Sequence, residues 1–163
     1  MYTKTADLCD EYIDQLEVPE SMFMHFGANT AFEGPIFTLK VFEDNTLVRE
    51  NLQKPGEGRV MVVDGGGSLR CALVGDRLAA LAVENGWTGI VVNGCIRDSA
   101  DIEHMPVGVM ALNTCPVKSI KRGEGQENIV VKFASATFTP GHYLYADEDG
   151  IVVAPQKLEL SEE

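Results

Sequence analysis

Residues 62–101 read VVDGGGSLRCALVGDRLAALAVENGWTGIVVNGCIRDSAD, and this stretch decides the fold. It holds a short apolar run, a glycine turn, a segment with helical spacing over 76–85, and a second apolar run, GIVVN. Gly86 follows the helical segment, at the position where helices commonly end in a glycine. Short apolar runs separated by a helix predict a βαβ unit whose parallel strands are buried on both faces.

The flanking residues extend this unit into one α/β domain spanning 1–163. Leu8, Tyr12 and Leu16 recur at helical spacing after Thr5, which predicts an amphipathic first helix. Apolar runs and turn residues predict the other elements. These are strands over 34–42, 59–63, 89–93 and 107–113, a helix over 43–53, and antiparallel C-terminal strands over 128–134, 136–141 and 142–154.

Composition narrows the class of protein. No apolar run approaches the roughly 20 residues that a membrane-spanning helix needs, and the first residues lack the pattern of a signal peptide. The four cysteines have no CxxC spacing, which favours reduced thiols in the cytoplasm. The net charge of −12 argues against direct nucleic-acid binding, because phosphate contacts need clustered Lys and Arg.

Two charged pairs, Asp76-Arg77 and Arg97-Asp98, stand at the two ends of the helix–strand segment and are expected to lie close together. A helix over 76–85 covers about 15 Å, and a returning strand of five or six residues covers about 17–20 Å. The chain thus returns to the sheet edge from which the helix started. Gly75-Asp76 and Arg97-Asp98 should therefore lie together at the carboxyl edge, where open α/β sheets bind ligands.

Each of these residues has a chemical use there. The helix start over 75–78 (Gly75, Asp76, Arg77 and Leu78) presents free amide donors that suit a carboxylate. Arg97 can hold a carboxylate in a bidentate pair or stabilise an enolate. Asp98 and Asp76 are oxygen ligands of the kind that Mg²⁺ or Mn²⁺ prefers. Together they predict a site for a small 2-oxo acid with a divalent metal.

Structural interpretations of the same residues stay open at this point. Asp76 suits the first turn of any helix, and Arg97-Asp98 also suits a surface turn. The Asp64–Gly67 turn fits neither the GxGxxG pattern nor the P-loop, so nucleotide binding is weakly supported.

The motifs GRVMVVDGGGSLRCALVGDRLA and NGWTGIVVNGCIRD resemble the family of the regulator of ribonuclease activity A and of class II 4-hydroxy-4-methyl-2-oxoglutarate aldolases. The resemblance extends from LCDEY to HYLYADEDGIVV, and its most specific element is Asp76 followed, after residues 77–96, by Arg97-Asp98. It implies a swivelling β/β/α fold, a homotrimer and metal-dependent aldol cleavage that releases pyruvate. It also implies roles for the site residues: Asp98 as metal ligand, Arg97 and the 75–78 amides as substrate contacts, and Asp76 as the group that orients a water.

Aldol cleavage of this kind implies a secondary decarboxylase activity. The family resemblance also leaves open a function without catalysis. Cleavage of the C3–C4 bond leaves a pyruvate enolate, and decarboxylation of oxaloacetate passes through the same species. The alternative is a regulator that binds and inhibits a ribonuclease, because the −12 charge suits a basic partner segment.

Two other mechanisms are disfavoured. A Schiff-base aldolase needs a lysine of lowered pKa, whereas Lys40 and Lys132 lie in strand-like runs where lysines usually face solvent. A phosphohistidine-transfer domain needs a histidine in the glycine turn, where there is none; His25, His104 and His142 lie elsewhere.

Overall fold

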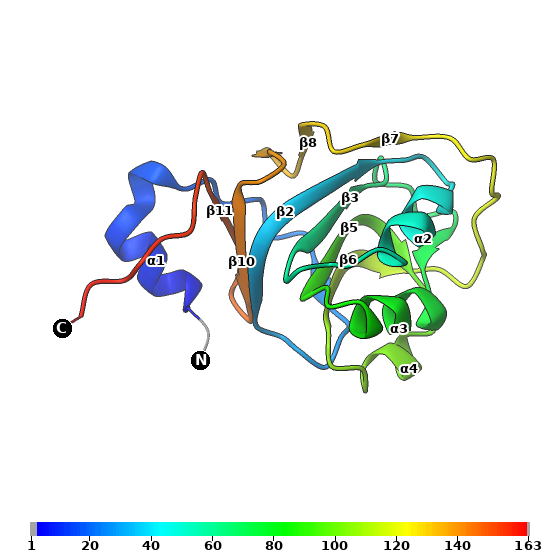
Figure 1. The fold of residues 1–163 in the computed structure, drawn as a ribbon, viewed down its shortest axis with the longest axis horizontal. Helices are drawn as coiled ribbons and strands as arrows, with labels where there is room; N and C mark the ends of the chain where they lie inside the picture. The colour runs from blue at the N-terminus through cyan, green and yellow to red at the C-terminus, as the bar shows by residue number, and fades with distance from the viewer. Residues whose placement is uncertain (1–2, 163) are drawn as a thin grey trace.

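The computed structural model describes residues 3–162, and its centre is one curled mixed sheet (Figure 1). Within these residues the strand order is β1-β6-β5-β3-β2-β10-β11, with β4 beside β5 and β7 beside β2. The strands are β1 (Met24–His25), β2 (Phe32–Lys40), β3 (Val60–Asp64), β4 (Ala72–Val74), β5 (Gly89–Ile96), β6 (Gly108–Thr114), β7 (Gln126–Glu127), β8 (Val131–Phe133), β9 (Ala136–Phe138), β10 (Tyr143–Asp147) and β11 (Gly150–Ala154). The helices are α1 (Thr5–Tyr12), the 3₁₀ turn η1 (Ile13–Gln15), α2 (Thr46–Leu52), α3 (Asp76–Glu84) and α4 (Ser99–Ile102).

The predicted parallel centre is confirmed. β2, β3, β5 and β6 pair in parallel, and every residue of β3 and β5 is buried. The C-terminal hairpin β10–β11 adds to β2 in antiparallel register, and β8–β9 form a separate hairpin. This arrangement confirms the predicted α/β fold with a parallel βαβ centre and antiparallel C-terminal strands.

Three apolar clusters hold the layers together. The largest lies between the parallel strands and α2, α3 and α4, which sit together on one side in Figure 1. A second joins the other face of the sheet to the β8–β9 hairpin. The third lies under α1, which packs against β10 and β11. The central sheet is therefore covered by apolar packing on both faces.

The predicted boundaries need correction at several places. The strand predicted over 34–42 is Phe32–Lys40, because Glu43 turns the chain at a φ of 55°. The helix predicted over 43–53 begins only at Thr46. The strand predicted to end at residue 93 continues to Ile96, past a register shift between Val92 and Cys95.

The glycine turn does not lead directly into the helix, contrary to the prediction. β4 intervenes and pairs in parallel with the end of β5, where β3 has already stopped. The backbone groups of Cys95 and Ile96 thus gain a partner strand that they would otherwise lack. The helix stop was predicted correctly, because Gly86 follows α3 at a φ of 79°.

No helix within residues 3–162 is long and apolar enough to cross a membrane.

Candidate active site

The start of α3 meets the residues that follow β5, as the sequence predicts. The Asp76 amide donates a hydrogen bond of 3.1 Å to Oδ2 of Asp98, and the Arg97 amide donates one of 2.9 Å to the Val74 carbonyl. Gly75 makes this contact possible, because a Cβ at that position would lie 2.8 Å from Oδ2 of Asp98. A side chain at this position would therefore force the Asp98 carboxylate to move.

Asp98 has an unusual backbone conformation. Its φ of 58° and ψ of 38° are left-handed, a region that non-glycine residues seldom occupy and that often marks functional sites. The Asp98 carbonyl accepts hydrogen bonds from the Asp101 and Ile102 amides in α4. The short helix α4 thus holds the turn that directs the Asp98 carboxylate back to the start of α3.

The amides at the helix start are only partly free. The Arg77 amide donates 2.9 Å to Oδ1 of Asp76, and the Asp76 amide is held by Asp98. Within residues 3–162 the Leu78 amide has no hydrogen-bond partner. A carboxylate that enters the site therefore finds the Leu78 amide free, whereas the Asp76 and Arg77 amides already have acceptors.

A cleft of about 970 Å³ opens over these residues. Its walls contain all of the sequence-predicted site residues: Gly75, Asp76, Arg77, Leu78, Arg97 and Asp98. Arg97 is half-buried, and its Nη1 lies 3.5 Å from the Pro116 carbonyl. The structure thus brings the whole predicted set into one cavity, although it does not by itself assign their chemical roles.

The cleft attracts anions, although the chain as a whole is acidic. Five cationic side chains line it (Arg49, Arg77, Arg97, Lys118 and Lys121), against two carboxylates. The chain carries 13 Lys and Arg against 25 Asp and Glu, so cations are strongly concentrated here. A cleft lined by one sign of charge raises the local concentration of ligands of the opposite sign. Its ligand is therefore expected to be an anion.

Sequence reasoning missed three of these cations. Arg49 comes from α2, while Lys118 and Lys121 come from the strap, defined here as residues 115–125 between β6 and β7. The available signal was the basic run KSIKR at 118–122 in an acidic chain. The position of this basic run beside the cleft depends on long-range contacts that the sequence pattern does not reveal.

Asp44 holds the strap in place. Its Oδ2 accepts hydrogen bonds from the Arg122 amide at 2.8 Å and the Glu124 amide at 3.1 Å. Its Oδ1 accepts from the amide and hydroxyl of Thr46. Burial alone would raise the pKa of Asp44, but these hydrogen bonds outweigh it and lower the pKa to about 2. The carboxylate therefore stays charged and anchors the strap at neutral pH.

The geometry does not support nucleotide binding at the glycine turn, a Schiff-base lysine or a phosphohistidine. The glycine-turn amides are occupied internally: Gly66 donates to Oδ1 of Asp64, and Gly65 and Gly67 donate to the Asn93 carbonyl. Lys40 and Lys132 are exposed, as expected for strand lysines. None of the three histidines lines the cleft.

The fold and the cleft define a class: an α/β protein with an anion-attracting site at the carboxyl edge of a parallel sheet. A family model described as RraA-like, Aldolase/RraA, matches residues 5–153. The chain belongs to this family.

Relatives and solved structures carry names that differ in activity. A protein of Laribacter hongkongensis named "Putative 4-hydroxy-4-methyl-2-oxoglutarate aldolase" is 60% identical, over 94% of this chain and 97% of its own. The RNA-processing inhibitor RraA from Thermus thermophilis superposes with a TM-score of 0.94 at 43% identity, covering 98% of this chain and 96% of that one. A Geobacillus kaustophilus structure named as an S-adenosylmethionine:2-dimethylmenaquinone methyltransferase has a TM-score of 0.93 at 53% identity, covering 99% and 100%. Because one fold carries three named activities, function must be argued from the site.

Proposed function

We propose that the protein is a class II aldolase that cleaves 4-hydroxy-4-methyl-2-oxoglutarate, or a related 4-hydroxy-2-oxo acid, to pyruvate. The observation that carries the proposal is the cleft in which the start of α3, Arg97 and Asp98 converge under cationic walls. The names of two relatives, 60% and 56% identical to this chain, support the same reaction.

The donor set fits a divalent cation that is held largely by water and substrate. Within residues 3–162 there is no group of three or more His, Cys, Asp or Glu side chains that could enclose a metal. A closed zinc site is therefore a poor fit. Mg²⁺ and Mn²⁺ suit the site better, since Mg²⁺ commonly binds one or two carboxylates and keeps several waters. Asp98 would be the direct ligand, with Asp76 acting through water.

A bound divalent cation would polarise the 2-oxo group of the substrate. The protein's own side chains supply the other functions. Arg97, a planar and permanently charged group, holds the substrate carboxylate and stabilises the negative charge that develops. The Leu78 amide and the positive end of α3 bind the same end of the substrate.

Proton transfer is assigned to a water oriented by Asp76. Oδ1 of this carboxylate accepts from the Arg77 amide, whereas its Oδ2 has no donor within residues 3–162. Oδ2 is therefore free to orient a water that takes the proton from the 4-hydroxyl group. The C3–C4 bond then breaks, C4 becomes a carbonyl, and the electron pair passes to C3 as the pyruvate enolate. Protonation at C3 gives pyruvate, and the same enolate accounts for a proposed oxaloacetate decarboxylase activity.

A coupled assay of pyruvate release tests this proposal. Turnover is expected to disappear with EDTA, to return with Mg²⁺ or Mn²⁺, and to be lost in Asp98→Ala. Asp101→Ala is the matched control, because Asp101 is exposed in the adjoining helix and does not line the cleft. Metal-independent turnover, or equal loss in both variants, would refute the assignment.

A second candidate function is the regulation of a ribonuclease by direct binding. The −12 net charge favours a basic partner segment, and the Thermus structure is named as an RNA-processing inhibitor. A pull-down with ribonuclease E, repeated at high salt, tests this. Salt-sensitive capture that persists in Asp98→Ala would support regulation separate from catalysis.

We also propose a homotrimer that acts in the cytoplasm. Four exposed apolar side chains lie on segments that contact one another around the strap: Phe42 (56% exposed), Leu69 (60%), Val117 (55%) and Ile120 (65%). Exposed apolar groups gathered in this way are typical of subunit interfaces. The four free thiols suit a reducing compartment. Analytical ultracentrifugation of the wild type and of Leu69→Asp tests the assembly, and a monomeric wild type would refute it.

A further inference from the structure

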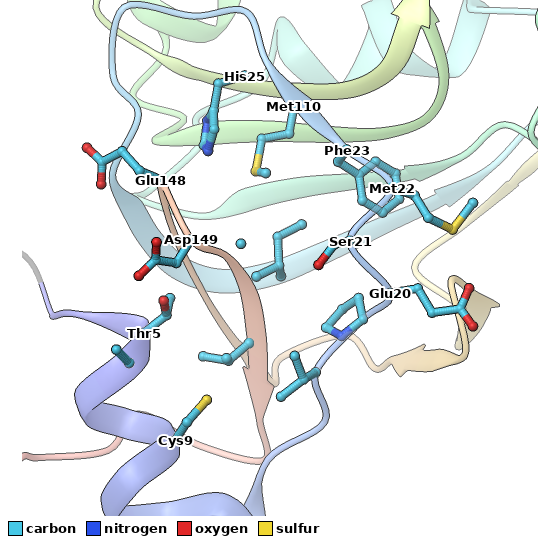
Figure 2. Close-up of a pocket in the computed structure, with 16 residues that line it drawn as sticks. Thr5, Cys9, Glu20, Ser21, Met22, Phe23, His25, Met110, Glu148 and Asp149 are labelled. Atoms are coloured by element: carbon cyan, nitrogen blue, oxygen red, sulfur yellow. The ribbon is translucent and has the colours of Figure 1, made fainter.

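A second cavity, which shares no lining residue with the cleft, lies between the two ends of the strand order. Its volume is about 320 Å³, and it lies between residues 18–25, which include β1, and residues 148–152, which include the start of β11 (Figure 2). We call it the seam groove, because β1 and β11 are the two ends of the strand order. A ring nitrogen of His25, Nε2, lies 2.7 Å from the Asp147 carbonyl and closes one end.

The outer edge of β11 is partly unpaired along this groove. The amide and carbonyl of Val153 both bond to Glu17, each at 2.9 Å. Backbone groups alternate in direction along an antiparallel strand, so those of Ile151 point to the same side as those of Val153. Within residues 3–162 no segment bonds to them on that side. One donor and one acceptor of β11 therefore face the seam groove.

The lining of the groove is apolar in its middle and acidic on both sides. Phe23 and Met110 lie between Glu148 and Asp149 on one side and Glu20 on the other (Figure 2), and the apolar Ile151 also lines the groove. Among residues 3–162 no Lys or Arg lines this groove, in contrast to the five cations of the cleft. The groove therefore favours a ligand with an apolar centre and positive groups around it.

We propose that the seam groove binds an extended, basic segment of a partner polypeptide. The segment adds to the outer edge of β11 through the backbone groups of Ile151, in the manner of an added β-strand. An apolar side chain packs on Phe23 and Met110. Flanking Arg or Lys side chains pair with Glu20 and with Glu148 or Asp149. The volume admits anchoring side chains and excludes a folded domain. This inference does not depend on the proposed aldolase reaction.

Fluorescence anisotropy with a labelled peptide, acetyl-Arg-Thr-Val-Thr-Arg-amide, tests the proposal, because its central Val and its two Arg side chains lie on one face of an extended strand. We expect binding that weakens with salt, no binding of the Glu-for-Arg peptide, and weaker binding of a peptide N-methylated at its central residue. The variant E20Q/E148Q/D149N should weaken binding about tenfold, because the two proposed surface ion pairs with the peptide are lost. The control E50Q/E84Q/D101N removes the same charge from exposed positions outside the groove and should leave binding nearly unchanged.

Cys9 provides an independent readout of where the peptide binds. It lines the groove and is partly exposed, whereas Cys71, Cys95 and Cys115 are buried. Bound peptide should slow alkylation of Cys9 by iodoacetamide, with Cys9→Ser as the blank. Three results would overturn the proposal: equal weakening in the control variant, unchanged Cys9 alkylation at saturating peptide, or equal affinity for free arginine amide.

Discussion

The Asp98 carboxylate accepts the Asp76 amide across residues 77–96, and this 3.1 Å contact joins the end of β5 to the start of α3. It fixes the geometry of the site before any ligand binds. Charged groups held in position in this way are the commonest source of large catalytic effects, because no reorganisation is needed during the reaction. The contact also makes the site sensitive to small changes in either partner.

Gly75→Ala should abolish most activity without unfolding the protein. The backbone of Gly75 is extended, so alanine is tolerated conformationally, but its Cβ would lie 2.8 Å from Oδ2 of Asp98. The carboxylate must move, and we expect turnover to fall about 10²–10³-fold, as for loss of one preorganised group. Steady-state pyruvate release and thermal unfolding measure the two effects. Turnover within twofold of the wild type would contradict this reading of the contact.

Arg97→Ala should lower kcat/KM by about 10²–10³-fold, because a preorganised positive charge is removed from the developing enolate. Arg97→Lys should recover only part of this loss, since lysine retains the charge but lacks the planar fork of arginine. Both variants are compared by kcat and KM in the pyruvate assay. Full activity in Arg97→Lys would show that charge alone suffices and that bidentate binding is absent.

Neutralising the strap should weaken substrate binding more than catalysis. We expect K118Q/K121Q to raise KM by up to about tenfold with little change in kcat, because two exposed charges contribute to binding alone. The matched control is K40Q/K132Q, which removes two exposed lysines outside the cleft. An equal rise in KM in the control would attribute the effect to net charge and not to the strap.

Asp44 should make folding sensitive to acid. Its pKa is lowered from 3.8 to about 2, so its stabilising contribution is present above pH 3.8 and is lost as pH falls towards 2. The shift corresponds to about 2 kcal/mol at 1.4 kcal/mol per pKa unit. Urea unfolding at several pH values should show this loss in the wild type and a smaller one in Asp44→Asn. Identical pH profiles would show that Asp44 is not the responsible group.

The sequence predicted the meeting of Asp76 and Asp98 because their separation is set by local geometry. One helix and one returning strand have known lengths, and parallel strands share an edge. The left-handed conformation of Asp98 could not be predicted, since it results from the packing of α4 behind it. The presence of β4 was missed as well, because three residues carry little periodic signal and pair only where β3 ends.

The cationic wall was missed for a different reason. Arg49 and Lys121 are far apart in the sequence and come together through hydrogen bonds that tie the strap to distant segments, those to Asp44 among them. Such contacts follow from the tertiary fold and leave no periodic pattern. The basic run at 118–122 can be seen in the sequence, but the sequence does not show which residues lie beside it in the folded protein.

The pairing of Glu17 with Val153 also protects the protein from aggregation through the edge of its sheet. An unpaired sheet edge is a template for strands of other molecules, and a long one invites aggregation. Here the chain covers its own last strand with a segment from near its beginning, leaving a single residue's backbone groups exposed beside it. Fibril growth needs several consecutive free positions, so one is too few to seed it. Removing the first 20 residues would leave the outer edge of β11 without a partner, and strands of many unrelated molecules would then pair with it.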